Sequence, residues 1–437
     1  MTVLLRAVEV DGAVVDCRLG DGLIAEVGRD LAVRPGDEVV DGRGGALIAG
    51  LADHHLHLLA IAARAGSIDV GLSLEPLRSA PGDGWIRAVG AVRELTRGDL
   101  DAVAAHRPVR VQHVGGSLWT LNTAALDRLG ITGAERETGQ LWRADARLRA
   151  LLADDPADDL VDDAVPDVAR VGAELAARGV THCTDATPDL DEDAVALITK
   201  AVPQHVLALG SARGSGPRKL VVGDHELPDP DALAAAIAMT HDAGRAVALH
   251  VVTRAALVIA VAALRAAGGR AGDRIEHAAV CDEEQAGELA ELGVIVVTQP
   301  GLLAAHGDRY LRDVDADDRR WLWRCAGLER AGVRVALSSD APYGPLDPWA
   351  TLRAARDRTT ATGVLVGADE RVTAASALRM MQTELDDPTG APRAVAAGQP
   401  ADVVLLHTSL RDALDALDAT AVRHTFIAGR AVTPSGR

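Results

Sequence analysis

Short apolar runs alternate with amphipathic segments through the middle of the chain. The strand-like runs stand at 47–52, 108–112, 180–184, 205–209 or 219–222, 246–251, 274–278, 292–298 and 333–338. The helix-like segments between them include 168–178, 230–243, 254–267 and 283–292. Buried parallel strands that alternate with amphipathic helices are typical of α/β proteins. About eight such repeats favour a closed (β/α)₈ barrel of the TIM type over an open sheet.

Both ends of the chain show a different pattern, that of short strands joined by turns. Neither end has enough apolar residues to build a sheet core of its own. We therefore predict that 1–45 and 396–437 combine into one small β-sandwich, and that 46–395 forms the barrel domain. The segments 58–107 and 114–167 exceed ordinary loops. We expect both as long loops over the carboxyl-end face of the barrel.

The composition narrows the class of protein. The 437 residues are 48% hydrophobic and 25% charged, the balance of a folded soluble chain. A net charge of −18 and 2% aromatic residues argue against nucleic acid and anionic membranes as partners. The four cysteines form no Cys-x-x-Cys motif, and the first residues lack the pattern of a signal peptide. We expect a cytoplasmic protein with a small-molecule substrate, and a homodimer is compatible with the sequence.

The most informative stretch is the run ALIAGLADHHLH, which ends in His55 and His57. In a strand, residues i and i+2 point to the same side, so both imidazoles would face one site. His250, His277 and Asp340 each end another apolar run. The carboxyl ends of barrel strands are where active sites are built. Imidazole and carboxylate groups gathered there are suitable ligands for Zn²⁺ or a similar ion.

At these residues the chain resembles the amidohydrolase superfamily, and within it the family-3 branch of metal-dependent hydrolases. The resemblance extends over essentially the whole chain. The motifs that carry it are GLADHHLH at 50–57, GVT at 179–181 with Asp185, RIEH at 274–277, TQP at 298–300, SSDAP at 338–342 and GQPAD at 398–402. The resemblance implies a barrel with an appended β-sandwich. It also implies that the metal-site positions are occupied by His55, His57, His250, His277 and Asp340.

This ligand set suggests hydrolysis of a C–N bond by metal-activated water, with Asp340 as general base. His277 orients water or substrate if it is not a ligand. Two-metal members of the superfamily use a carboxylated lysine as a bridge, and Lys219 is the candidate here; the alternative is an exposed lysine beside a flexible turn. An amidohydrolase is the leading hypothesis. An aminohydrolase that deaminates a heterocycle and a catalytically silent scaffold are the alternatives.

The substrate pocket is less defined by the sequence. Many family-3 members carry Asp-Gly-His after the second strand, and the matching stretch 113–119 lacks that Asp and His. The candidate substrate contacts are His113, Trp119, Asn122, His306, Arg309, Tyr310 and Tyr343. Packing, helix capping or an ordinary loop position is the alternative for each. Asp185 either contacts the site or accepts hydrogen bonds from backbone amides.

Overall fold

The computed structural model describes residues 2–432 except 117, 143, 154–166, 212, 213, 215 and 224–226. The end of the predicted sandwich segment, 433–437, and part of the predicted loop at 114–167 lie outside the described residues. The chain forms two compact units: unit 1 is Met1–His57 with Ala169–Arg437, and unit 2 is Leu58–Val168.

The two ends of the chain each contribute to a four-stranded sheet in unit 1. The first sheet, in the order β3-β2-β1-β4, consists of β1 (Thr2–Val10), β2 (Ala13–Gly20), β3 (Leu23–Gly28) and β4 (Asp37–Asp41). The second, in the order β21-β20-β19-β5, consists of β5 (Leu47–Ala49), β19 (Val403–Leu406), β20 (Val422–Ile427) and β21 (Arg430–Val432). Leu5 and Ile24 from one end share a hydrophobic core with Val403 and Phe426 from the other. The two ends thus bury their apolar residues together, as their separate shortage of such residues predicts.

Eight strands of unit 1 run parallel in two sheets. The first sheet, ordered β13-β12-β6, contains β6 (Leu51–Leu56), β12 (Val180–Asp185) and β13 (His205–Ala208). The second follows chain order and contains β14 (Arg218–Val221), β15 (Val247–Val251), β16 (Arg274–His277), β17 (Ile295–Thr298) and β18 (Arg334–Leu337). Backbone hydrogen bonds link the two sheets at both edges, from Asp340 N to His55 O (2.8 Å) and from Lys219 N to Leu209 O (3.0 Å).

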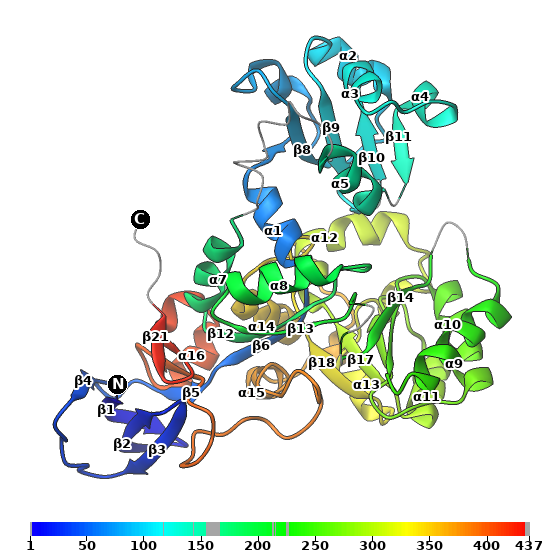
Figure 1. The fold of residues 1–437 in the computed structure, drawn as a ribbon. Coiled ribbons are helices and arrows are strands. Elements are labelled where there is room, and N and C mark those ends of the chain that lie inside the picture. The colour runs from blue at the N-terminus through cyan, green and yellow to red at the C-terminus, as the bar shows by residue number, and fades with distance from the viewer. Residues whose placement is uncertain are drawn as a thin grey trace. The chain divides into compact units, whose positions relative to one another are not determined.

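Helices follow most of these strands. They are α7 (Val168–Ala176), α8 (Glu192–Ala201), α9 (Pro230–Asp242), α10 (Arg254–Ala267), α11 (Glu283–Leu292), α12 (Pro300–Asp313), α13 (Ala326–Arg330), α14 (Pro348–Asp357), α15 (Ala374–Arg379) and α16 (Leu410–Ala416). Figure 1 shows α9, α10 and α11 grouped beside β14, and their apolar faces share a core with β15, β16 and β17. No helix among the described residues is long and apolar enough to cross a membrane.

The predicted run 47–52 is two strands, because the chain changes sheet at Gly50. A Cβ atom at this position would lie 2.2 Å from Oγ1 of Thr181, so only glycine fits. β5 before it pairs with β19, and β6 after it pairs with β12. The turn at Gly50 therefore carries the chain directly from the terminal sheet to the strand that bears His55.

Unit 2 corrects the prediction of two long loops. It contains a five-stranded sheet of β7 (Ile68–Asp69), β8 (Ile86–Ala91), β9 (Val109–His113), β10 (Leu118–Leu121) and β11 (Gln140–Trp142). It also contains α1 (Leu58–Ala65), α2 (Arg97–Ala104), α3 (Thr123–Arg128), α4 (Ala134–Thr138) and α5 (Asp145–Ala153). The run at 108–112, expected as a barrel strand, is β9 of this sheet. An apolar run predicts a strand but does not identify the sheet that the strand joins. Unit 2 has apolar cores of its own, which is why this strand pairs within it.

Candidate metal centre

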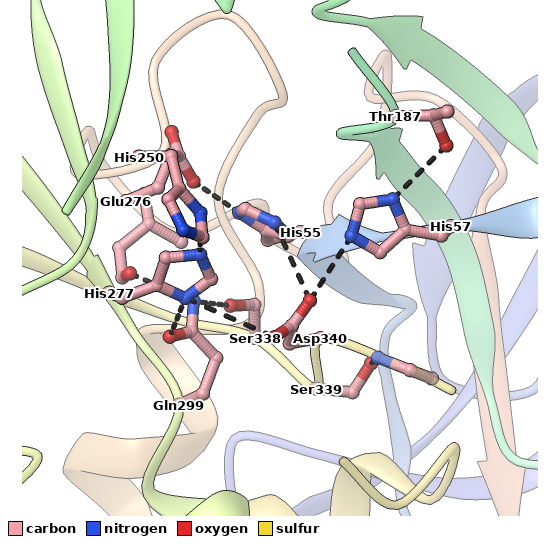
Figure 2. Close-up of polar contacts among 12 residues, drawn as sticks. His55, His57, Thr187, His250, Glu276, His277, Gln299, Ser338, Ser339 and Asp340 are labelled. Atoms are coloured by element: carbon pink, nitrogen blue, oxygen red, sulfur yellow. Dashed lines mark hydrogen bonds and ion pairs between the residues drawn. The ribbon is translucent and has the colours of Figure 1, made fainter. Parts of the chain in front are cut away.

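Three of the predicted ligands meet where β6 and β18 end. Nε2 of His57 lies 3.2 Å from Oδ1 of Asp340, and Nε2 of His55 lies 3.6 Å from the same oxygen. One ligand atom of each residue lies within 4.8 Å of the others. Figure 2 shows both imidazoles directed at the Asp340 carboxylate. The Asp53 carboxylate fixes this junction, because its Oδ1 accepts from the backbone N–H groups of His55 (3.2 Å) and Ser339 (3.1 Å).

The Asp340 carboxylate suits a divalent cation. Its Oδ1 is buried and accepts no hydrogen bond of good geometry from the described residues. Burial opposes ionisation of this carboxyl, yet His57, His277 and Lys219 together hold its pKa below the usual value. Its backbone has a φ of +54°, a costly conformation that concentrates at functional sites. A buried, ionised oxygen beside two imidazole nitrogens matches the donor set of a zinc-type site.

His55 is oriented by a buried ion pair. Its Nδ1 donates to Oε2 of Glu276, and Glu276 in turn pairs with Arg274. The exposed fractions of the three side chains are 0%, 0% and 1%. Burial, reinforced by the nearby Lys219, lowers the pKa of His55 well below its usual value. His55 is therefore neutral, with Nε2 facing Asp340, as a metal ligand requires.

His57 is held by the turn after β12. Its Nδ1 lies 3.1 Å from Oγ1 of Thr187, and Oδ1 of Asp185 accepts from the backbone N–H of Thr187 at 2.9 Å. Of the two roles predicted for Asp185, the structure thus shows the contact with a backbone amide.

His277 and His250 form the opposite side of the centre. The amide oxygen of Gln299 can only accept, so Nδ1 of His277 donates to it (2.8 Å) and Nε2 of His277 accepts from Nδ1 of His250 (2.9 Å). Burial lowers the pKa of His277, which supports the neutral form. Both histidines lie beside the ligand group, since the rings of His277 and His55 are 4.8 Å apart. Their own role as ligands stays a prediction.

Lys219 lies inside the site, so the alternative of an exposed lysine is wrong. It is buried, and its Nζ lies 3.3 Å from Nε2 of His55. Burial lowers the pKa of its amine, although Glu276 and Asp340 oppose the shift. Its carboxylation stays a prediction.

Of the seven predicted substrate contacts, His306, Arg309, Tyr310 and Tyr343 belong to unit 1 and the other three to unit 2. His306 and Tyr343 are near the centre: the Tyr343 ring meets the edge of His57 at 5.6 Å, and Nε2 of His306 lies 2.9 Å from the Tyr343 carbonyl oxygen. The other group, His113, Trp119 and Asn122, belongs to unit 2.

The contacts of this second group are internal to unit 2. Nε2 of His113 lies 2.9 Å from Oγ1 of Thr120, and Trp119 belongs to a core cluster. Asn122 caps α3 and also donates to two backbone carbonyls. These are the packing and capping roles that the sequence left open, and contact with substrate stays a prediction for all three.

Three residues that orient the candidate ligands were not predicted, namely Glu276, Gln299 and Thr187. Glu276 and Gln299 stand inside quoted motifs, and the charge of Glu276 within a buried strand was the available signal for that residue. Thr187 follows a strand end as one of many threonines. No sequence pattern pointed to it.

A second group of His182, His205 and Asp402 also brings three ligand atoms within 4.8 Å. Here, however, Arg393 donates to His182 (2.6 Å). Burial and this guanidinium lower the pKa of His182, and a cation beside Arg393 would be repelled. The ion pair of His205 with Asp402 at 3.2 Å is sufficient to explain why these side chains lie together, without a metal ion.

Comparison with known proteins identifies the family of the chain. The sequence matches the model of the amidohydrolase family over residues 38–433, and the chain belongs to this family. It is 26% identical to an N-substituted formamide deformylase of Arthrobacter pascens, with 82% of this chain and 83% of the relative aligned.

Two solved structures are similar in fold. A metal-dependent hydrolase of Pyrococcus horikoshii has a TM-score of 0.74 at 18% identity, covering 99% of this chain and 100% of its own. A mutant atrazine chlorohydrolase of Arthrobacter aurescens TC1, complexed with zinc and atraton, has a TM-score of 0.57 at 15% identity, covering 99% and 95%. At these identities the likeness concerns the fold.

Proposed function

We propose that this chain is a metal-dependent amidohydrolase that uses water to cleave a C–N bond, other than a peptide bond, in a small molecule. The observation that carries the proposal is the convergence of His55, His57 and Asp340, whose ligand atoms lie within 4.8 Å of one another and include a buried carboxylate oxygen that accepts no hydrogen bond of good geometry from the described residues. Membership of the amidohydrolase family and the deformylase relative support the same reaction class.

His55, His57 and Asp340 would hold the ion, for which zinc is our choice because imidazole nitrogens and carboxylate oxygens are its usual protein ligands. A bound divalent ion supplies a water with a pKa lowered from about 15.7 toward ~7. Asp340, ionised and at the centre of the ligand group, accepts the proton of the attacking water and donates it to the leaving nitrogen. His277, kept neutral and oriented by Gln299, lies where it can hydrogen-bond substrate or water.

We further propose that Lys219 is carboxylated in the metal-loaded protein, where it would serve as the bridging lysine and, with His250 and His277, would hold a second ion. Its burial and its 3.3 Å distance from Nε2 of His55 support this. Growth or incubation with ¹³C-bicarbonate is expected to give a carbamate carbon resonance that Lys219→Ala lacks. Identical spectra for the two proteins would contradict the bridge.

The same proposal includes the finer architecture: a closed barrel and a separate β-sandwich domain. The hydrogen bonds that connect the two parallel sheets at both edges support closure. The shared core of the two terminal sheets supports the sandwich.

The test is a hydrolysis screen of the metal-loaded protein with N-formyl amines, other simple amides, cyclic amides and heterocyclic amines. We expect carboxylate release from an amide, and loss of a proton-transfer group in Asp340→Asn is expected to reduce kcat about 10²- to 10⁴-fold. Ammonia release from a heterocyclic amine would instead favour the aminohydrolase alternative. Activity that is unchanged in Asp340→Asn would overturn the proposed mechanism.

A further inference from the structure

A series of ring contacts connects the candidate metal ligands with aromatic side chains beside them. It includes the imidazoles, with ring centroids 5.4 Å apart for His57 and His55 and 4.8 Å apart for His55 and His277. An aromatic residue follows at each end of this series of imidazoles: the Tyr343 ring lies 5.6 Å from His57, and the Trp323 ring lies 6.3 Å from His277. Both contacts are edge-on, with interplanar angles of 79° and 87°.

Two residues of α12, Tyr310 and His306, connect Trp323 with Tyr343. Tyr310 lies 6.1 Å from Trp323 and 6.4 Å from His306, and His306 bonds to the Tyr343 carbonyl oxygen at 2.9 Å. Leu302, Leu303 and Val366 pack in the same cluster. The wall beside the imidazoles is therefore apolar and aromatic.

This concentration of aromatic residues is unusual for the chain. The whole sequence has six tryptophans, two tyrosines and one phenylalanine. Both tyrosines and two of the tryptophans, Trp321 and Trp323, nevertheless meet in this one cluster, whereas the core beside α9, α10 and α11 consists of aliphatic residues and Cys281. A planar, rigid wall placed against the metal centre is suited to contact an apolar group of a substrate.

Trp323 is held in place at a cost in backbone energy. Its φ is +49°, which is strained for a bulky residue. The fully buried guanidinium of Arg358 fixes this conformation by donating to the carbonyl oxygens of Leu322 (2.7 Å), Trp323 and Val366 (3.2 Å). Outliers of this kind cluster where a side chain must be positioned for function.

The Trp323 side chain also has an unused polar group. Its Nε1–H is buried, the residue being 3% exposed, and it donates to no acceptor among the described residues. Buried donors of this kind are rare in native proteins and call for a partner. The indole and the His277 ring are 6.3 Å apart in a T-shaped arrangement, so this side chain lies next to the candidate metal centre.

The aromatic side chains of this cluster are uncharged. Burial raises the pKa of Tyr310 to about 12, so its phenol is neutral. Arg309 lies over the Tyr310 ring at 5.9 Å and pairs with Asp313 at 3.5 Å, and the guanidinium of Arg358 is bonded to backbone carbonyl oxygens. A carboxylate group placed against this wall would lose hydration.

We propose that Trp323 determines specificity, and that with Tyr310 and Tyr343 it forms a subsite for an uncharged aryl group of the substrate. The inference rests on the proposed function for the identity of the reaction, but the subsite itself is defined by binding. It names the substrate class as small amides that carry one aromatic substituent.

The experiment compares two matched pairs of amides in which phenyl replaces methyl. They are N-benzylacetamide with N-ethylacetamide, and phenylacetamide with propionamide, so that the aryl group stands on the nitrogen side or on the acyl side. We expect the phenyl member of one pair to have a kcat/KM about 10- to 100-fold higher. Trp323→Ala should bring that ratio close to one, whereas Trp323→Phe should keep most of it.

Trp321→Phe is the control within the same cluster, because the Trp321 ring stacks on the guanidinium groups of Arg320 (4.4 Å) and Arg324 (4.8 Å). Its ratio should equal that of the wild type. Trp323→Leu, which keeps apolar volume, takes the place of Trp323→Ala if the alanine variant does not fold. A wild-type ratio near one in both pairs, or a ratio unchanged in Trp323→Ala or Trp323→Leu, would overturn the inference.

Failure of the proposed function gives a different result. If none of the four amides is hydrolysed, their dissociation constants are measured by calorimetry on the same proteins. Tighter binding of a phenyl compound that is lost in Trp323→Ala or Trp323→Leu would uphold the subsite although the reaction is not amide hydrolysis. Equal binding of phenyl and methyl compounds, or no binding, would overturn it.

Discussion

Glu276 is not a candidate metal ligand, but metal affinity should depend on it because its carboxylate orients the ligand His55. Its carboxylate is fully buried between Arg274 and Nδ1 of His55. Replacing Glu276 by Gln keeps the volume but removes the charge that fixes the tautomer and direction of His55. Loss of a partner that orients a ligating histidine lowers metal affinity about 10- to 100-fold. This corresponds to about 1.4 to 2.8 kcal/mol.

The same substitution also leaves the buried guanidinium of Arg274 without its counterion. Breaking a buried pair costs about 3–5 kcal/mol. We expect the lower end of this range, because Nη2 of Arg274 keeps its hydrogen bond to the His54 carbonyl oxygen (2.7 Å). The loss of stability should be seen in chelator-treated protein as well, since it does not depend on the ion.

The assay therefore measures two quantities: zinc affinity by competition with a chromophoric chelator, and denaturant unfolding of the metal-free protein. Glu370→Gln is the matched control, since Glu370 is buried and bonds to Arg324 (2.8 Å) and to the backbone N–H groups of Cys325 and Gly327, none of which is a candidate ligand. We expect both variants to lose stability and only Glu276→Gln to lose zinc affinity. Wild-type affinity in Glu276→Gln, or an equal loss in the control, would refute the reasoning.

Two further predictions concern stability. Gly50→Ala forces a Cβ atom to within 2.2 Å of buried Thr181 and should lower the free energy of unfolding by about 1–3 kcal/mol or more. Gly287→Ala, inside α11 with nothing within 4 Å of the added Cβ atom, should raise it by about 0.5–1 kcal/mol. Similar denaturation midpoints for the two variants would contradict this. The hydrogen bond to Asp402 raises the pKa of His205, so the stability that this pair adds is present below the unfolded pKa of about 6.5 and is lost as pH rises through the raised folded value. His205→Gln should therefore lower the melting temperature more at about pH 5.5 than at about pH 9, by a small amount because His205 is half exposed; the opposite order would exclude the pair as the cause.

The sequence predicted elements well where local signals mark their ends. Helices α10 and α11 have the predicted limits, 254–267 and 283–292. Each starts after a capping side chain, Thr253 or Asp282, and α11 ends at Gly293 in the left-handed conformation. Unit 2 was not predicted, because apolar runs carry no information about which sheet a strand joins.

In the candidate site, too, the residues marked by a local sequence signal were predicted and those placed by tertiary contacts were not. His55, His57 and Asp340 were found because their residue types are rare at the ends of apolar runs and match a known spacing. The contacts that orient them depend on tertiary structure: Glu276 meets His55 across 221 positions of sequence, and Thr187 meets His57 across 130. Trp323 was missed for this reason too, since its placement depends on the buried Arg358 some thirty-five positions later.

The central claim is that His55, His57 and Asp340 bind one and the same ion. The most direct measurement is the anomalous X-ray difference map, at the zinc absorption edge, of crystals of this protein grown with zinc. The account predicts a peak within coordination distance of Nε2 of His55, Nε2 of His57 and the Asp340 carboxylate. No peak there, with or without one beside His182 and His205, would contradict it.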